Sequence, residues 1–273
     1  MSDIKALSKK YFEENAVRYT EDHYFKLKDH PKWNRHKSIL ELVEEFVPEK
    51  GSKVLDIGCG PGLLAIDLGR RGYIGIGMDI SEKMLSIAKK QGSESDIRGW
   101  KFLLGDAEKT NLEDASFDCV IASGVIEYMT EDSKMLKEIN RLLKPGGHLI
   151  LNVSNLLGYS TSLNFVTDRL KKIPGVMKVA SKLRKIATNS EYGADQLHFS
   201  PRKHFVPNFH KTLGQYGFYS ESNRYLHFTF LPAPFSTLTH SFLHKVDAKL
   251  DVLDRTPLRI FGATQLICAR KVS

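Results

Sequence analysis

Residues 54–62, with the sequence VLDIGCGPG, decide the fold. Strand-favouring residues lead into Asp56, glycines follow at Gly58, Gly60 and Gly62, and a helical pattern begins at Leu63. A strand, a glycine-rich turn and a helix in this order place a ligand at the N-terminus of the helix. We therefore predict that this loop binds a nucleotide-type ligand.

The spacing of the glycines argues against two common nucleotide motifs. A dinucleotide-binding loop requires a further small residue where this chain has Leu63, because helix and strand pack closely there. No Gly-Lys-Ser/Thr sequence follows, so the phosphate-binding Walker pattern also fails. The carboxylate of Asp56 would repel a pyrophosphate but suits a ligand that carries an ammonium group. A dinucleotide is therefore not the expected ligand.

Four further motifs follow the loop in order. GIGMDIS places Asp79 at the end of a second strand, where an acid can accept both hydroxyls of a ribose. LLGDAEKTNL contains Asp106 and Ala107, FDCVIASGVIEYM contains a strand that ends near Ser123, and LLKPGGHLILNVSN contains a fifth strand after a turn. In these five motifs, over residues 54–155, the chain resembles the class I S-adenosylmethionine-dependent methyltransferases.

This resemblance implies that S-adenosyl-L-methionine is the cofactor. It assigns cofactor contacts to Arg35, Asp56, Gly58, Gly60, Asp79, Ile80, Asp106, Ala107 and Ser123. By resemblance, the two glycines let the backbone approach the methionine part, whose ammonium faces Asp56 and whose carboxylate faces Arg35. Asp79 would hold the ribose, and Asp106 and Ala107 would contact the adenine.

The pattern of the chain predicts an α/β fold. Strand-like segments alternate with helical ones over residues 53–153, which is typical of a parallel sheet whose ligands lie at the carboxyl ends of the strands. With the resemblance, this predicts a Rossmann-like, seven-stranded, mostly parallel sheet with an antiparallel final strand over residues 258–272. We expect one domain over residues 1–273, consisting of a helical cap (1–47), a cofactor-binding core (48–155), a basic helical insertion (156–204) and a completion of the sheet (205–273).

The basic character of the chain is concentrated in one segment. The formal charge is +8, and residues 165–190 contain seven Lys or Arg residues against the single acid Asp168. Two amphipathic segments separated by Pro174-Gly175 can cover a substrate, lie on an anionic membrane or form a solvated lid. Nucleic acid is not the expected partner, because no aromatic-interleaved basic surface is visible.

The compartment is predicted from the cysteines and from the start of the chain. The three cysteines match no disulfide or zinc pattern, so we expect buried thiols in a reducing environment. The first residues are charged and lack the apolar core of a secretory signal. We expect a cytoplasmic protein that can contact a membrane peripherally through residues 165–190.

The acceptor side of the site is predicted less directly. Candidate bases are Glu127 and Tyr128 after the fourth strand, and His198 and His204 in the later segment LHFSPRKHF. Histidine suits this task because its unperturbed pKa is about 6.5. In ubiquinone O-methyltransferases, which the chain resembles in its core, a Glu-x-x-Glu-His sequence is associated with a divalent metal. The matching positions here are Gly124, Glu127 and Tyr128, so no metal is expected.

Together these features predict in-line transfer of a methyl group from S-adenosyl-L-methionine to a small-molecule or lipid-like acceptor, at oxygen. Positioning of donor and acceptor supplies most of the acceleration in such a displacement, and a base adds about 10²- to 10⁴-fold. Two alternatives stay open at this point. One is an RNA methyltransferase, supported only by positive charge, and the other is a non-catalytic protein that binds the cofactor or a lipid surface.

Overall fold

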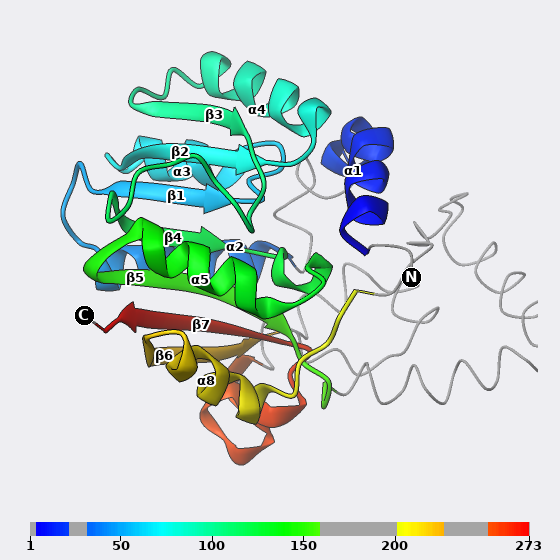
Figure 1. The fold of residues 1–273 in the computed structure, drawn as a ribbon, viewed down its shortest axis with the longest axis vertical. Coiled ribbons are helices and arrows are strands. Elements are labelled where there is room, and N and C mark those ends of the chain that lie inside the picture. Colours follow the sequence, from blue (N-terminus) through cyan, green and yellow to red (C-terminus); the bar gives the residue numbers. More distant parts are fainter. Residues whose placement is uncertain (1–3, 22–31, 159–200, 227–250, 273) are drawn as a thin grey trace, which may run out of the picture.

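The fold is built on one seven-stranded sheet (Figure 1). The computed structural model describes residues 4–21, 32–158, 201–226 and 251–272. The strand order is β3-β2-β1-β4-β5-β7-β6. The strands are β1 (Lys53–Ile57), β2 (Ile74–Asp79), β3 (Trp100–Leu104), β4 (Phe117–Ala122), β5 (Leu143–Ser154), β6 (Phe218–Leu226) and β7 (Thr264–Lys271). The predicted seven-stranded α/β fold is confirmed.

Strands β1 to β5 are parallel, and β7 enters antiparallel between β5 and β6. The prediction that the final strand begins near residue 258 is wrong, because Pro257–Phe261 forms a 3₁₀ helix, η6, before β7. Pro257 has a fixed φ and no N–H for a ladder, and the Thr256 hydroxyl accepts a hydrogen bond from the N–H of Leu258 at 3.2 Å. A helical turn therefore forms where the alternation of apolar and polar residues alone indicated a strand.

Strand β5 starts earlier than predicted. Helix α5 ends at Leu142, and Leu143 already pairs with Phe117 of β4. The register then shifts, so that Cys119 pairs with His148, and Gly146 within the intervening bulge has a φ of +76°. The turn expected at Pro145-Gly146-Gly147 is thus a bulge inside the strand, as glycine at positive φ permits.

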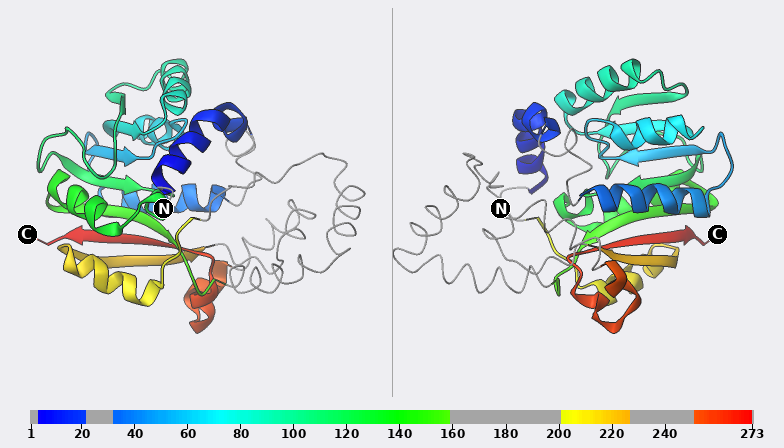
Figure 2. Two further views of the ribbon diagram at one scale, coloured as in Figure 1. Left: turned by 45° about the vertical axis from the view of Figure 1, so that its right-hand side comes forward. Right: turned by 180° about the vertical axis from the view of Figure 1, so that it is seen from behind.

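Helices cover both faces of the sheet. Helices α5 and α8 lie on one face, and α2 and α3 lie on the other (Figures 1 and 2). The helices are α1 (Ile4–Thr20), α2 (Lys32–Phe46), α3 (Leu63–Arg70), α4 (Glu82–Glu94), α5 (Asp132–Leu142) and α8 (Val206–Gln215). Within the described residues, no helix is long and apolar enough to cross a membrane.

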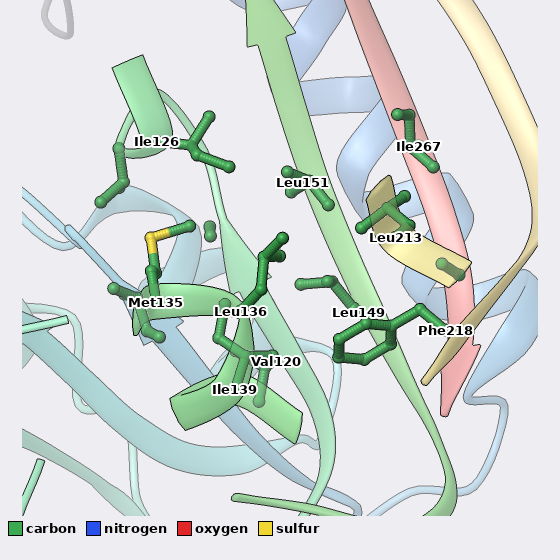
Figure 3. Close-up of a cluster of buried hydrophobic side chains, with 14 of the residues drawn as sticks. Val120, Ile126, Met135, Leu136, Ile139, Leu149, Leu151, Leu213, Phe218 and Ile267 are labelled. Carbon is green, nitrogen blue, oxygen red and sulfur yellow. The ribbon is translucent and has the colours of Figure 1, made fainter. Parts of the chain in front are cut away.

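The hydrophobic core under α5 and α8 fixes these helices on the sheet. Met135, Leu136 and Ile139 of α5 are fully buried, and Leu136 and Ile139 lie beside Val120 of β4 and Leu149 of β5 (Figure 3). Spacing of three to four residues places such side chains on one helix face, and each contributes about 1.5–3 kcal/mol through burial. This packing holds the carboxyl ends of β4 and β5 beside each other.

Helix α1 lies beyond the carboxyl ends of the parallel strands (Figure 1). It packs on α4, and Glu13 of α1 accepts a hydrogen bond from Ser81 Oγ at 2.6 Å. Ser81 is the N-cap of α4, because its Oγ also accepts from the N–H of Met84. The predicted N-terminal helices therefore exist, and the first of them covers the ligand-binding edge of the sheet.

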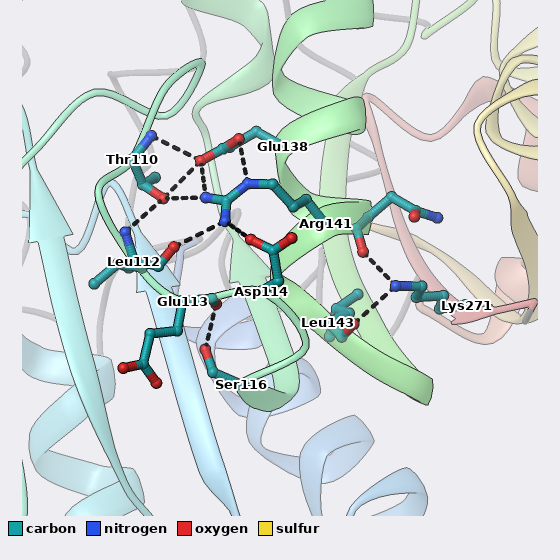
Figure 4. Close-up of polar contacts among 10 residues, drawn as sticks. Thr110, Leu112, Glu113, Asp114, Ser116, Glu138, Arg141, Leu143 and Lys271 are labelled. Atoms are coloured by element: carbon teal, nitrogen blue, oxygen red, sulfur yellow. Dashed lines mark hydrogen bonds and ion pairs between the residues drawn. The ribbon is translucent and has the colours of Figure 1, made fainter.

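A polar network ties the connection between β3 and β4 to α5 (Figure 4). Arg141 donates to Glu138 Oε1 at 2.7 Å, to the carbonyl of Leu112 at 2.8 Å and to the Asp114 carboxylate. Thr110 donates to Glu138 through both its N–H and its hydroxyl. Burial acts to raise the pKa of Glu138, but these hydrogen bonds outweigh it and lower that pKa to about 2.

Several predicted features lie outside the described residues. These are the basic segment 165–190 with most of the predicted insertion, and the candidate base His198.

All three cysteines are free and buried, as predicted.

Candidate functional site

The loop between β1 and α3 has a backbone conformation that favours glycine. Gly58, Gly60 and Gly62 all have positive φ, at 69°, 51° and 83°. At Gly58 an added Cβ would also lie 2.4 Å from a methyl of Val125. Both the positive φ and this close contact therefore exclude a side chain at Gly58. The N–H groups of Gly58 and Cys59 both donate to the carbonyl of Met78, which fixes the loop against β2.

The loop borders a cavity of about 260 Å³ at the carboxyl ends of the strands. Its walls come from α1, the start of α2, the ends of β1, β2 and β5, the segments after β3 and β4, and Pro201. The sequence-predicted residues among them are Arg35, Gly58, Gly60, Asp79, Ile80, Asp106, Ala107, Ser123, Glu127 and Tyr128. The fold therefore brings together most of the residues that were predicted to act at one site.

Asp79 lies at the end of β2, 9% exposed, in the cavity wall. Its carboxylate accepts from the N–H of Gly60 at 2.8 Å and from the N–H of Ser81 at 2.9 Å. Burial raises its pKa, although these backbone hydrogen bonds act in the opposite direction. Asp79 thus joins the glycine loop to the start of α4 and still presents a carboxylate to the cavity.

Asp56 is placed differently from the prediction. The resemblance implied that it faces the ligand's ammonium, but the residue is only 3% exposed and does not line the cavity. It belongs to β1 itself, one residue before the end of the strand, so the turn at Gly58 separates it from the open edge. Burial, together with the charge of Asp79, raises its pKa to about 8.

The far end of the cavity carries an ion cluster that the sequence did not indicate. Lys5 of α1 lies in the wall, with its Nζ 2.5 Å from Asp106 Oδ2 and 2.5 Å from Glu108 Oε2. The other Asp106 oxygen accepts from the N–H of Glu108 at 2.9 Å. Burial acts to lower the pKa of Lys5, but its bonds to the two carboxylates outweigh it and raise that pKa.

Glu127 lies in the short 3₁₀ helix η3 (Ile126–Tyr128) after β4. It is 5% exposed and lines the cavity. One carboxyl oxygen, Oε1, accepts from Ser154 Oγ at 2.8 Å and from Asn152 Nδ2 at 3.4 Å. The other, Oε2, is buried and has no hydrogen-bond partner among the residues that the structure describes. Burial raises the pKa of Glu127, while the Ser154 hydrogen bond and the nearby Arg35 and His204 act to lower it.

Aromatic side chains form the wall next to Glu127. Phe12 of α1 contacts Tyr128 edge to face, with ring centroids 5.5 Å apart, and packs in the same way on Tyr19 at 5.4 Å. All three rings line the cavity together with Met129. Burial raises the pKa of Tyr128 far above its usual value, so this side chain stays a phenol. A wall of this kind suits a flat apolar group.

His204 does not line the cavity, and this corrects its prediction as a base. Its ring is 7% exposed, packs edge to face on Phe209, and lies with Nε2 3.1 Å from Asp132 Oδ1. Burial acts to raise the pKa of Asp132, but the hydrogen bond and charge of His204 and the charge of Arg202 outweigh it and lower that pKa. His204 is therefore engaged with a carboxylate away from the cavity.

Sequence reasoning missed several cavity residues. Ser154 could have been found, because it is the last residue of β5, at the edge where ligands bind in parallel sheets. Lys5 and Pro201 carry no such signal, since their positions depend on how distant segments pack across the sheet. Within the described residues, no group of three or more His, Cys, Asp or Glu side chains is arranged to hold a metal ion.

Residues 55–151 match the family model of the methyltransferase domain. They form a methyltransferase domain. This match confirms the resemblance to S-adenosylmethionine-dependent methyltransferases that the five motifs indicated. The methyltransferase domain contains the glycine loop, Asp79, Asp106 and Glu127, whereas Lys5, Arg35, Ser154 and Pro201 lie outside it.

Two groups of relatives are similar to this part of the chain. A ubiquinone biosynthesis O-methyltransferase of Coxiella burnetii is 31% identical over 116 residues, which are 42% of this chain and 49% of the relative. A demethylmenaquinone methyltransferase of Listeria monocytogenes is 33% identical over 129 residues, 46% of this chain and 51% of the relative. The chain therefore spans about half the length of the curated relatives it matches.

The similarity in fold extends beyond the methyltransferase domain. The magnesium protoporphyrin IX methyltransferase of Synechocystis PCC 6803, solved with bound SAH, superposes with a TM-score of 0.63. The match covers 98% of this chain and 100% of that structure at 20% sequence identity. At this identity the similarity shows the fold alone.

Proposed function

We propose that this protein transfers the methyl group of S-adenosylmethionine to a hydroxyl oxygen of a small aromatic acceptor. The observation that carries this proposal is that Glu127 lines the cavity together with the donor-binding motifs, while its buried Oε2 has no hydrogen-bond partner within the described part of the chain. An unsatisfied buried acceptor of this kind costs about 1–3 kcal/mol, and a donor group on a bound molecule would relieve that cost. A hydroxyl is such a group.

The cavity fits the donor. The glycine loop presents backbone without side chains to the cavity at Gly58 and Gly60, and Asp79 presents a carboxylate for the ribose. Asp106 and Ala107 lie where the adenine would be held, with Ile80 and Met84 as apolar walls. Arg35 and Ser123 line the cavity near Gly124, where the amino-acid part of the donor would lie. When bound, S-adenosylmethionine supplies an electrophilic methyl group on a positively charged sulfur, and transfer leaves a neutral thioether.

Glu127 is the group that we assign to the hydroxyl proton. As a carboxylate it accepts that proton at Oε2, which leaves the acceptor oxygen free to bond to the methyl carbon. Ser154 holds Oε1 at 2.8 Å and thereby orients Oε2. Burial raises the pKa of Glu127 from its usual value toward the working pH of an enzyme, where a general base is most effective.

The acceptor class follows from the walls of the cavity. Phe12, Tyr19 and Tyr128 offer ring edges and faces to a planar molecule, and Met129 adds an adaptable apolar surface. The names of both groups of relatives refer to quinone compounds, ubiquinone and demethylmenaquinone. A phenol or catechol combines a flat ring with the hydroxyl that Glu127 requires.

The test is production of S-adenosylhomocysteine from S-adenosylmethionine and a panel of catechols by the purified full-length protein. We expect Glu127→Gln to lower kcat by about 10²- to 10⁴-fold while donor affinity stays within twofold. The matched control is Glu131→Gln, an exposed acid four residues away that forms a surface ion pair with Lys134. Transfer at the wild-type rate by Glu127→Gln, or no transfer to any hydroxylated aromatic, would contradict the proposal.

A further inference from the structure

A four-residue segment before α8, residues 201–204, bridges two parts of the proposed site. On one side the N–H of His204 donates to the carbonyl of Ser154 at 2.8 Å, and the N–H of Leu156 donates to the carbonyl of His204 at 2.9 Å. On the other side the N–H of Arg202 donates to the carbonyl of Glu127 at 2.9 Å. The bridging segment is therefore bonded both to the end of β5 and to η3.

The side chains of the same segment converge on one acid. Arg202 Nη1 donates to Asp132 Oδ1 at 2.8 Å, and His204 Nε2 lies 3.1 Å from the same oxygen. Arg202 Nη1 also donates to the carbonyl of Met129 at 3.1 Å, directly after η3. Asp132 begins α5, whose buried face is packed on the sheet. Arg202 therefore links η3 to a helix that is itself firmly held.

The bridging segment connects the same two elements as the Ser154–Glu127 hydrogen bond, namely the end of β5 and η3. Its N–H groups at His204 and Arg202 donate to the carbonyls of Ser154 and Glu127, so the separation of these two side chains depends on where the segment holds the main chain. Pro201 at the start of the segment lines the cavity itself. A shift of the segment would move a wall, the carboxyl of Glu127 and the ring of Tyr128 together.

We propose that Asp132, Arg202 and His204 are positioning residues that hold η3 against the end of β5 and thereby place Glu127 and Tyr128 for the acceptor. This inference rests on the proposed function for its effect on turnover, but the hold on η3 is a property of the protein without ligands. Displacement of a reacting group by about 1 Å can cost about a hundredfold in rate, so such a hold affects kcat.

The donor site is attached to different elements. Asp79, Asp106 and the glycine loop are fixed by β2, the segment after β3 and α1, whereas Arg202 and His204 bond to η3, Asp132 and the end of β5. Loss of the positioning contacts should therefore lower kcat with the acceptor and leave donor affinity unchanged. A residue needed only for folding would instead reduce donor affinity, turnover and thermal stability together.

The experiment compares Arg202→Ala, Arg202→Lys, Asp132→Asn and His204→Gln in the full-length protein. Lysine keeps a cation for Asp132, and glutamine places an N–H near the position of His204 Nε2. The control is Lys134→Ala, which removes a surface ion pair on the same helix α5 without touching η3. The first measurement is amide hydrogen exchange of residues 125–131 without any ligand. The second is S-adenosylhomocysteine affinity by calorimetry, and the third is kcat and KM with the best catechol.

For Arg202→Ala we expect exchange at the Tyr128 and Met129 amides to quicken about tenfold and kcat to fall about ten- to a hundredfold. Affinity for S-adenosylhomocysteine should stay within twofold, and Arg202→Lys should recover most of both losses. Unchanged exchange in Arg202→Ala and Asp132→Asn would overturn the positioning role, as would faster exchange with unchanged kcat. A wild-type protein that transfers no methyl group overturns the proposed function, and exchange alone then decides whether the contacts hold η3.

Discussion

The ammonium of Lys5 lies 2.5 Å from Asp106 Oδ2, which brings a residue from the start of the described chain to the segment after β3. Glu108 takes a second contact from the same ammonium. Together with the bond from Ser81 to Glu13, these contacts hold α1 over the donor end of the cavity at two points. We therefore expect these contacts to determine how long a ligand beneath α1 stays bound.

Replacement of Lys5 by alanine should speed the release of S-adenosylhomocysteine about fivefold, which corresponds to about 1 kcal/mol for a partly exposed ion pair. The physical reason is that α1 then stays in place through fewer contacts. Stopped-flow measurement of the dissociation rate checks this, with Lys10→Ala as control, because Lys10 pairs with Glu14 on the exposed side of the same helix. Equal rates in both variants would show that Lys5 does not retain the ligand.

Asp79→Ala should weaken binding of S-adenosylmethionine ten- to a hundredfold. The change removes charge-assisted hydrogen bonds of about 1.5–3 kcal/mol and frees the N–H of Gly60 from its acceptor. Calorimetric titration measures the effect directly. Unchanged affinity would refute the assignment of Asp79 to the donor.

Asp56 should make the ligand-free protein less stable as pH rises. Its folded pKa of about 8 lies above the usual 3.8, so the folded state retains a proton that the unfolded chain has lost. Between about pH 4 and pH 8 this linkage lowers the free energy of unfolding by about 1.4 kcal/mol per pH unit. Urea titrations across this window should show Asp56→Asn gaining stability over the wild type as pH increases. Glu94→Gln, on the exposed face of α4, should follow the wild type, and a constant difference for Asp56→Asn would be inconsistent with a raised pKa.

Arg141→Ala should lower the free energy of unfolding by about 2 kcal/mol at neutral pH, because it leaves the half-buried carboxylate of Glu138 without its main charged partner. The pKa of Glu138 is depressed to about 2, so its contribution is complete above about pH 4.5 and is lost as pH falls from there toward 2. Thermal unfolding at pH 7 and pH 3 should therefore separate wild type and variant more at pH 7. Arg70→Ala, which removes an exposed pair with Asp67, serves as the control.

The parts of the site that follow the parallel sheet could be predicted from the sequence. Asp79 ends a strand, and Asp106 and Glu127 come shortly after one, each in a recognisable motif. Parallel strands bring such residues to one edge of the sheet. The glycine loop was equally clear, because Gly58 and Gly60 need backbone conformations that few other residues adopt.

The remainder depends on packing between segments that are distant in sequence. Lys5 reaches Asp106 only because α1 packs on α4, and no local pattern around Lys5 encodes that contact. The sequence suggested His204 as a candidate base. Only the folded chain shows that its Nε2 lies 3.1 Å from Asp132 Oδ1. Asp56 was assigned to the ligand from its place in the motif, whereas its burial depends on how tightly the turn at Gly58 closes over β1.

The position of β7 between β5 and β6 has a consequence for biosynthesis. A ribosome makes residues 264–271 after both strands that β7 joins, so β5 and β6 present unpaired edges until β7 emerges. The nascent chain can bury α2 and α3 against β1 and β4 during translation, but it cannot complete its sheet. Until residues 264–271 emerge, these exposed edges can pair with other chains, so chaperones should matter most to this protein during that interval.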